Sequence, residues 1–122
     1  MAAEEAVLRT MLFDFYGELL TEKQREYFDL HYNEDLSLAE IAALTGISRQ
    51  GVRDVIVRAE NYMTEIEDKT GLIKRFMQLQ PHVEKITDAA EQIKQLNFRR
   101  YEDRQLEELA GVIEAEAAAL KE

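Results

Sequence analysis

The sequence contains no cysteine, which excludes disulfide bonds, a thiolate nucleophile and a cysteine-ligated zinc site. One proline and five glycines in 122 residues are too few for a loop-rich β protein or a disordered linker. No apolar run approaches the ~20 residues that span a bilayer. The first residues, MAAEEAVLRT, are acidic where a signal peptide would be basic. We therefore expect a soluble, cytoplasmic protein with no membrane partner.

Basic residues are also scarce, since 15 Lys and Arg face 25 Asp and Glu and the formal charge is -10. The excess is uneven: residues 1–70 carry seven basic and fifteen acidic residues, whereas residues 71–122 carry eight and ten. Proteins that bind nucleic acid neutralise phosphates with Lys and Arg, so this balance argues against tight, autonomous DNA binding. An acidic surface is better suited to a basic protein partner.

Apolar residues recur with the period of an α-helix along the whole chain, and no segment alternates with the period of a strand. The helices have clear start and stop signals. Capping boxes begin at Thr21 and Ser37, where a hydroxyl residue precedes Gln or Glu by three positions. Gly46 ends one helix, Ser48 caps the next, and Gly71 ends that one. The sequence predicts an all-α protein.

The second half predicts a helical extension. An apolar stripe ends at Gln80, and Pro81 suits the first turn of a new helix that breaks at Asn97. A last helix carries the apolar stripe Leu106, Leu109, Ile113, Ala117 and Leu120. We therefore expect two domains, residues 1–80 and residues 81–122. The C-terminal stripes are candidates for a homodimer interface.

Residues 37–58, SLAEIAALTGISRQGVRDVIVR, have the pattern of a helix-turn-helix. Gly46 supplies the turn, and we attribute Gly51 to a close crossing of the two helices. Thr45 stands where this motif usually has a larger apolar residue, for which Leu44 can substitute. Arg and Gln near the start of the second helix can read guanine and adenine edges in the major groove. The candidate DNA-contacting residues are Ser48, Arg49, Gln50, Arg53, Asp54 and Arg58.

Catalytic signals are absent. The two histidines, His31 and His82, lie in different predicted helices, and the acidic pairs are typical of solvated helix faces. The sequence has no phosphate-binding glycine loop, nucleophile elbow or EF-hand. We expect no enzymatic activity, no cofactor and no metal site.

Four short motifs between Leu12 and Glu60 are distinctive: Leu12–Tyr16 (LFDFY), Leu19–Gln24 (LLTEKQ), Ser37–Ala42 (SLAEIA) and Ile47–Gln50 (ISRQ). With these motifs, the segment from Leu12 to Glu60 resembles the YlxM family of small bacterial helix-turn-helix proteins, and the resemblance continues to about Phe76. Three residues depart from the family pattern: Gly51 for a usual Ala, Arg53 for a common Tyr, and Val57 for a common Lys.

The resemblance implies a fold like region four of sigma factors, followed here by the additional C-terminal helices. It also implies a link to the signal recognition particle pathway, because family genes commonly neighbour that of the particle's GTPase. The leading expectation is a non-enzymatic accessory or regulatory protein that contacts the targeting GTPase or its ribonucleoprotein particle. The alternative is a DNA-binding transcriptional regulator that uses the helix-turn-helix.

Overall fold

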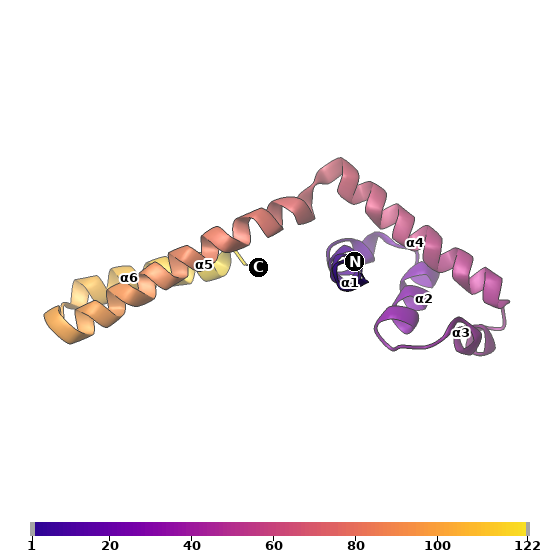
Figure 1. Ribbon diagram of the computed structural model, residues 1–122, viewed down its shortest axis with the longest axis horizontal. Coiled ribbons are helices and arrows are strands. Elements are labelled where there is room, and N and C mark those ends of the chain that lie inside the picture. The colour runs from indigo at the N-terminus through magenta and orange to yellow at the C-terminus, as the bar shows by residue number, and fades with distance from the viewer. Residues whose placement is uncertain (1, 122) are drawn as a thin grey trace. The chain divides into compact units, whose positions relative to one another are not determined.

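The computed structural model describes residues 2–121, which form helices and connecting turns without any strand. The elements are α1 (Ala2–Tyr16), the short η1 (Gly17–Leu19), α2 (Glu22–Tyr32), α3 (Leu38–Thr45), α4 (Arg49–Thr70), α5 (Leu72–Leu96), the π-helical turn η2 (Asn97–Tyr101) and α6 (Arg104–Ala119) (Figure 1). This confirms the all-α prediction. The chain divides into two compact units, residues 1–73 and 74–122.

The predicted helix boundaries of the first unit are confirmed, because each rests on a local hydrogen bond. Thr21 and Ser37 both form complete capping boxes with Gln24 and Glu40. Two hydrogen bonds from Ser37 also lower the pKa of the Glu40 carboxyl. Gly46 and Gly71 end their helices with φ of 78° and 63°. A β-carbon disfavours this left-handed conformation, so glycine is the natural residue at both places.

The core of the first unit is built along one side of α4, against which α1, α2 and α3 pack (Figure 1). The ring of Phe28 is 1% exposed and stacks on Phe13 at 5.0 Å, while Tyr32 lies 4.7 Å away on its other flank. These aromatic residues of α1 and α2 therefore form part of the core. The fully buried contributors from α3 and α4 are Ile41, Val52, Ala59 and Met63.

A polar network closes the far end of this core. The Tyr16 hydroxyl donates to Glu67 Oε1 at 2.6 Å and lies 2.8 Å from Thr70 Oγ1. The same carboxylate oxygen accepts the backbone N–H of Ile73 at 2.9 Å, so it also satisfies an unpaired donor in the first turn of α5. Burial, together with the Glu67 hydrogen bond, raises the pKa of Tyr16 above its usual value. The network ties α1 to the end of α4.

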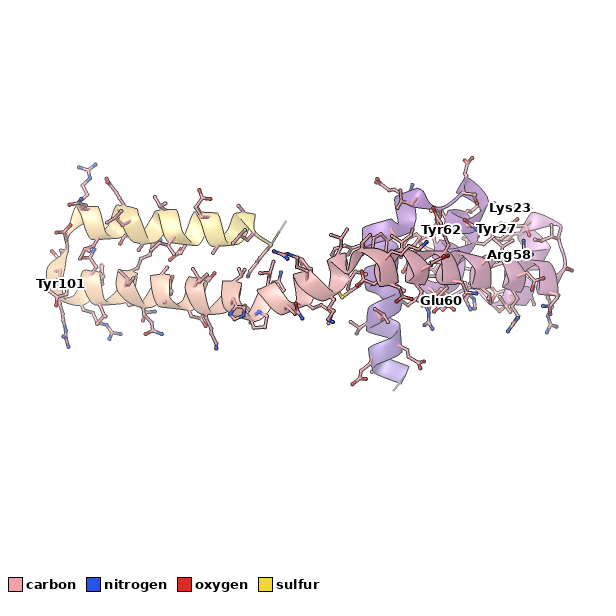
Figure 2. All side chains as sticks on the ribbon, turned by 90° about the horizontal axis from the view of Figure 1, so that it is seen from above. Lys23, Tyr27, Arg58, Glu60, Tyr62 and Tyr101 are labelled. Carbon is pink, nitrogen blue, oxygen red and sulfur yellow. The ribbon has the colours of Figure 1, made fainter. Side chains whose placement is uncertain are left out.

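The second unit is a hairpin in which α5 and α6 run antiparallel and side by side (Figures 1 and 2). The prediction of a helix start at Pro81 is wrong, because Pro81 lies inside the continuous helix α5. A proline there removes one backbone hydrogen bond. However, Phe76, Val83 and Ala90 follow one another at intervals of seven, so packing on both sides of the proline uses the same helix face. That burial offsets the lost hydrogen bond.

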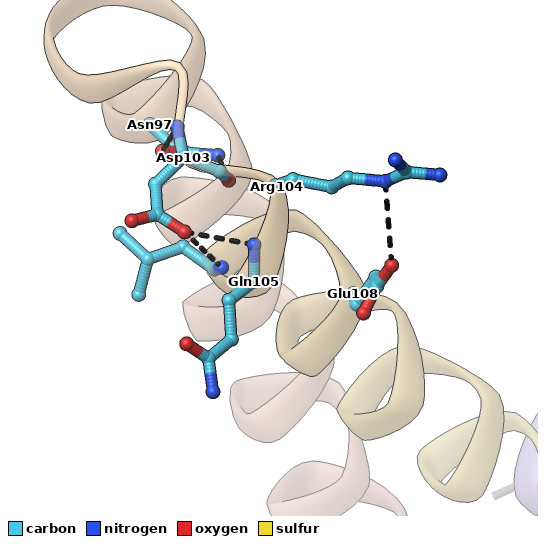
Figure 3. A network of polar contacts seen from close by, with 6 residues as sticks. Asn97, Asp103, Arg104, Gln105 and Glu108 are labelled. Carbon is cyan, nitrogen blue, oxygen red and sulfur yellow. Dashed lines mark hydrogen bonds and ion pairs between the residues drawn. The ribbon is translucent and has the colours of Figure 1, made fainter.

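The predicted break at Asn97 is confirmed. The Asn97 side chain is 3% exposed, donates to the backbone oxygen of Asp103 at 2.7 Å and accepts the Asp103 N–H at 2.8 Å (Figure 3). Asp103 in turn caps α6 by accepting the N–H groups of Gln105 and Leu106. Between them, Glu102 adopts a left-handed conformation with φ of 49°. One amide side chain thus closes the loop and aligns the helix that follows.

The residues buried between α5 and α6 are small. Val83 and Ala90 of α5 and Ala110 and Ala117 of α6 are 1–2% exposed, and Lys94 pairs with Glu114 across the hairpin at 3.2 Å. The Glu114 hydrogen bond raises the pKa of Lys94. The predicted α6 stripe is therefore buried only at Ala117. Its large members are between 38% and 62% exposed: Leu106, Leu109, Ile113 and Leu120.

Candidate nucleic-acid interface

The helix-turn-helix consists of α3, a turn at Gly46 and the first turns of α4. Ser48 has the extended backbone of an N-cap, and its Oγ accepts the N–H of Gly51 at 3.0 Å. The cap therefore fixes the residue at which α4 begins. Because α4 has 3.6 residues per turn, that starting point decides which of its side chains face the core and which face solvent.

All six predicted contact residues are exposed, and they lie in the first three turns of α4 away from its buried side. The buried side is formed by Val52, Ile56 and Ala59. Figure 2 shows Arg58 and Tyr62, which lie about one helical turn apart on α4. All six are therefore open to solvent at the start of α4, where Arg49 and Arg53 form one row, Gln50, Asp54 and Arg58 form a second at intervals of four residues, and Ser48 is the N-cap.

Local hydrogen bonds already hold three of these side chains. Ser48 is occupied as the cap, and the Gln50 amide donates to Asp54 Oδ1 at 3.0 Å, one turn along the helix. This bond orients the Gln50 amide and places a carboxylate in the middle of the surface. The cationic groups on this surface are the exposed guanidinium groups of Arg49, Arg53 and Arg58.

Sequence reasoning missed Arg9, which changes the charge balance beside this surface. Its Nε lies 3.4 Å from Glu60 Oε1, and its guanidinium lies 4.3 Å above the ring of Tyr32. The pKa of Tyr32 is raised, mainly by burial, and the positive charge of Arg9 partly counteracts this rise. Because Arg9 offsets Glu60, the middle of α4, just beyond Arg58, is less acidic than its own sequence indicates. The partners are 51 residues apart, so no local pattern signals the pair.

Two explanations given for residues of the motif are wrong. A β-carbon at Gly51 would meet Ser48 Oγ at 3.1 Å and Ile47 Cδ1 at 3.5 Å, so the glycine makes room for the cap of its own helix and not for a crossing helix. Leu44 does not substitute for a larger residue at Thr45, because it is 69% exposed. The Thr45 hydroxyl instead donates to the Ile41 carbonyl oxygen at 2.8 Å within α3.

A second surface feature is acidic. A shallow depression on the first unit is lined by the half-buried ring of Phe13 and by Glu22, Glu26 and Asp29, with Arg25 also on its wall. Glu22, Glu26 and Asp29 lie on one side of α2, since they are separated by four and three residues. The depression therefore combines an aromatic floor with an excess of carboxylates. Both features attract a cation.

Within residues 2–121, no three His, Asp or Glu side chains are grouped so that they would hold a metal ion. Over the same residues, none of the helices combines the length and the apolar character needed to cross a bilayer.

Comparison with known proteins gives one consistent family. The family model described as "Putative helix-turn-helix protein, YlxM / p13 like" matches residues 3–111. A UPF0122 protein of Thermoanaerobacter sp. (strain X514) is 45% identical over 92 residues, which are 75% of this chain and 79% of the relative. A UPF0122 protein of Bacillus thuringiensis (strain Al Hakam) is 40% identical over 112 residues, 92% and 94% of the two chains.

These matches extend past Phe76, where we expected the resemblance to end, and include most of the α5–α6 hairpin. The hairpin is therefore part of the family pattern. The chain belongs to the UPF0122 family of YlxM/p13-like helix-turn-helix proteins.

Proposed function

We propose that this protein is a non-enzymatic accessory protein of the cytoplasmic signal recognition particle pathway, which binds a basic surface of the targeting GTPase or its ribonucleoprotein particle. The YlxM resemblance supplies the pathway. The acidic depression on the first unit supplies the physical reason, because three carboxylates and the Phe13 ring surround it. It is this depression that carries the proposal.

The chemistry of the depression suits an arginine or lysine side chain of a partner. A cation over the Phe13 ring interacts with its π electrons, and the carboxylates that line the depression accept hydrogen bonds from a guanidinium. Arg25 offsets one of the three carboxylates, so the depression keeps an excess of negative charge. The net charge of the first 70 residues, -8, attracts a basic partner at longer range.

A binding measurement with the purified targeting GTPase tests this proposal. We expect Glu22→Gln/Glu26→Gln to raise the Kd about three- to tenfold at low salt, as loss of charge complementarity predicts. The matched control is Glu107→Gln/Glu108→Gln, which removes the same charge from exposed positions of α6. Equal weakening by both double variants, or binding that does not change with salt, would contradict a docking role for the depression.

DNA binding is the second candidate function, and the exposed arginines at the start of α4 favour it. Arg49 and Arg53 are one turn apart beside the oriented Gln50 amide, which is the arrangement of a recognition helix. The pairing of Arg9 with Glu60 removes one carboxylate that would otherwise oppose phosphate. Asp54 remains the main unfavourable group.

A gel shift with genomic fragments at about 100 mM salt, where exposed charges are largely screened, tests the DNA reading. If the chain reads DNA, Arg49→Ala weakens specific retention about tenfold or more, the effect of losing one bidentate base contact. Arg104→Ala is the control, because Arg104 is an exposed arginine of α6 paired only with its neighbour Glu108. Equal retention of wild type and Arg49→Ala would exclude α4 as the reading element.

A further inference from the structure

The hairpin of α5 and α6 leaves one face of large apolar side chains without cover. The buried seam is formed at intervals of seven residues, at Val83 and Ala90 on α5 and at Ala110 and Ala117 on α6. Three residues after each seam position stands an exposed isoleucine or leucine, and Leu79 and Leu106 precede these rows by seven residues; all six are 38–62% exposed. We call these six residues the apolar face: Leu79, Ile86, Ile93, Leu106, Ile113 and Leu120.

The six side chains point to the same side of the hairpin. A residue three positions further along a helix lies about 60° back around the axis. The offset from seam to exposed residue is the same on both helices, and the helices are antiparallel. Consequently the two rows face one direction. Helix layers are stable when such a face is packed against another layer, so the hairpin has the form of half a four-helix bundle.

The charges beside the apolar face identify its occupant. Lys85 lies on the outer edge of α5 and Glu116 on the outer edge of α6, whereas Arg99 and Glu102 belong to the connection between the two helices. The two outer edges therefore carry opposite charges at Lys85 and Glu116. Residues 71–122 are also close to charge balance, with eight basic and ten acidic residues, so two copies meet there with little net repulsion.

The register of the hairpin aligns these edges. Asn97 is hydrogen-bonded to Asp103, which places Ala90 level with Ala110 and Val83 level with Ala117. When a twofold axis runs parallel to the helices, every residue keeps its height, and α5 of one copy covers α6 of the other. Lys85 then stands level with Glu116 of the other copy. An axis across the helices would instead set α5 on α5, so that Lys85 of one copy would not meet Glu116 of the other.

We propose that two copies of the chain associate through the apolar face, with α5 of each copy over α6 of the other in an antiparallel four-helix bundle. This interface is isologous, so each contact occurs twice. It covers the six apolar side chains and pairs Lys85 of each copy with Glu116 of the other. The dimer also contains two helix-turn-helix units. This proposal does not depend on which candidate function is correct.

Sedimentation of the full chain across about 1–100 μM tests the association, a range in which a dimer of moderate affinity dissociates. We expect wild type to reach twice the monomer mass of 14.2 kDa. Ile86→Glu should raise the dimer Kd at least about a hundredfold, because it places a charge in the centre of the apolar face. Met77→Glu is the matched control: Met77 is 51% exposed and lies half a turn around α5 from that face. Circular dichroism verifies that both variants remain helical.

Charge reversal tests the arrangement of the helices. Lys85→Glu and Glu116→Lys should each raise the dimer Kd about three- to tenfold, since each creates two repulsive contacts. Mixing the two single variants should restore wild-type affinity in a heterodimer, in which every reversed charge meets its opposite. A chain that stays monomeric, or equal effects of Ile86→Glu and Met77→Glu, overturns the dimer. A dimer that the mixture does not restore overturns the placement of α5 over α6.

Discussion

Replacement of Phe28 by alanine is expected to lower the free energy of unfolding of the helix-turn-helix unit by about 3–5 kcal/mol, the usual cost of deleting a buried phenylalanine ring. Phe28 is 1% exposed, stacks on Phe13 and touches Tyr32. The substitution removes the centre of the aromatic cluster and leaves a cavity between α1 and α2. Both neighbouring rings lose a partner, so the loss extends beyond the area that Phe28 itself buries.

Urea denaturation followed by circular dichroism at 222 nm measures this loss, since the sequence has no tryptophan for fluorescence. Leu44→Ala is the control in the same unit, because Leu44 is 69% exposed and should change stability by less than about 0.5 kcal/mol. If Phe28→Ala cost no more than Leu44→Ala, the core described along α4 would be placed incorrectly.

Features that depend on residues close in sequence could be predicted. The capping boxes at Thr21 and Ser37 and the glycine end at Gly46 involve groups within about one helical turn, and all three are confirmed. The exposed side of α4 follows from the same logic. Once Ser48 fixes the first residue of the helix, helical geometry sends Arg49, Gln50 and Arg53 to solvent together.

Features that depend on distant partners could not be predicted. The pairing of Arg9 with Glu60 and of Tyr16 with Glu67 each joins residues 51 positions apart. The prediction at Pro81 failed for another reason. The preference of proline for the first turn of a helix predicted a start there, but burial on both sides of Pro81 favoured one continuous helix. In the hairpin, the apolar stripe of α6 identified from the sequence consists mostly of large residues, but close packing of two helices buries Ala90, Ala110 and Ala117.

Asn97→Ala is expected to destabilise the hairpin by about 1–3 kcal/mol, the net value of two hydrogen bonds. The Asn97 amide satisfies both the oxygen and the N–H of Asp103, at 2.7 and 2.8 Å, and it is itself buried. Without it, the loop loses the bonds that hold Asp103 in place to cap α6. Native-state hydrogen exchange should show amides of α6 exchanging about fivefold faster or more, which corresponds to the lower end of that range.

Two comparisons separate this role from a general effect of losing an asparagine. Asn33→Ala removes an exposed amide that bonds Asp29 at 2.7 Å, and we expect it to leave α6 exchange unchanged. Asn97→Asp keeps an acceptor for the Asp103 N–H but sets a carboxylate oxygen against the Asp103 carbonyl, so it should destabilise the hairpin at pH 7. Burial and the facing Asp103 carbonyl oxygen should raise the folded-state pKa of that new carboxyl. Its protonated form then donates to the carbonyl, so stability relative to wild type should recover as pH falls toward 4. A pH-independent deficit in Asn97→Asp would mean that the donated hydrogen bond is not what holds the loop closed.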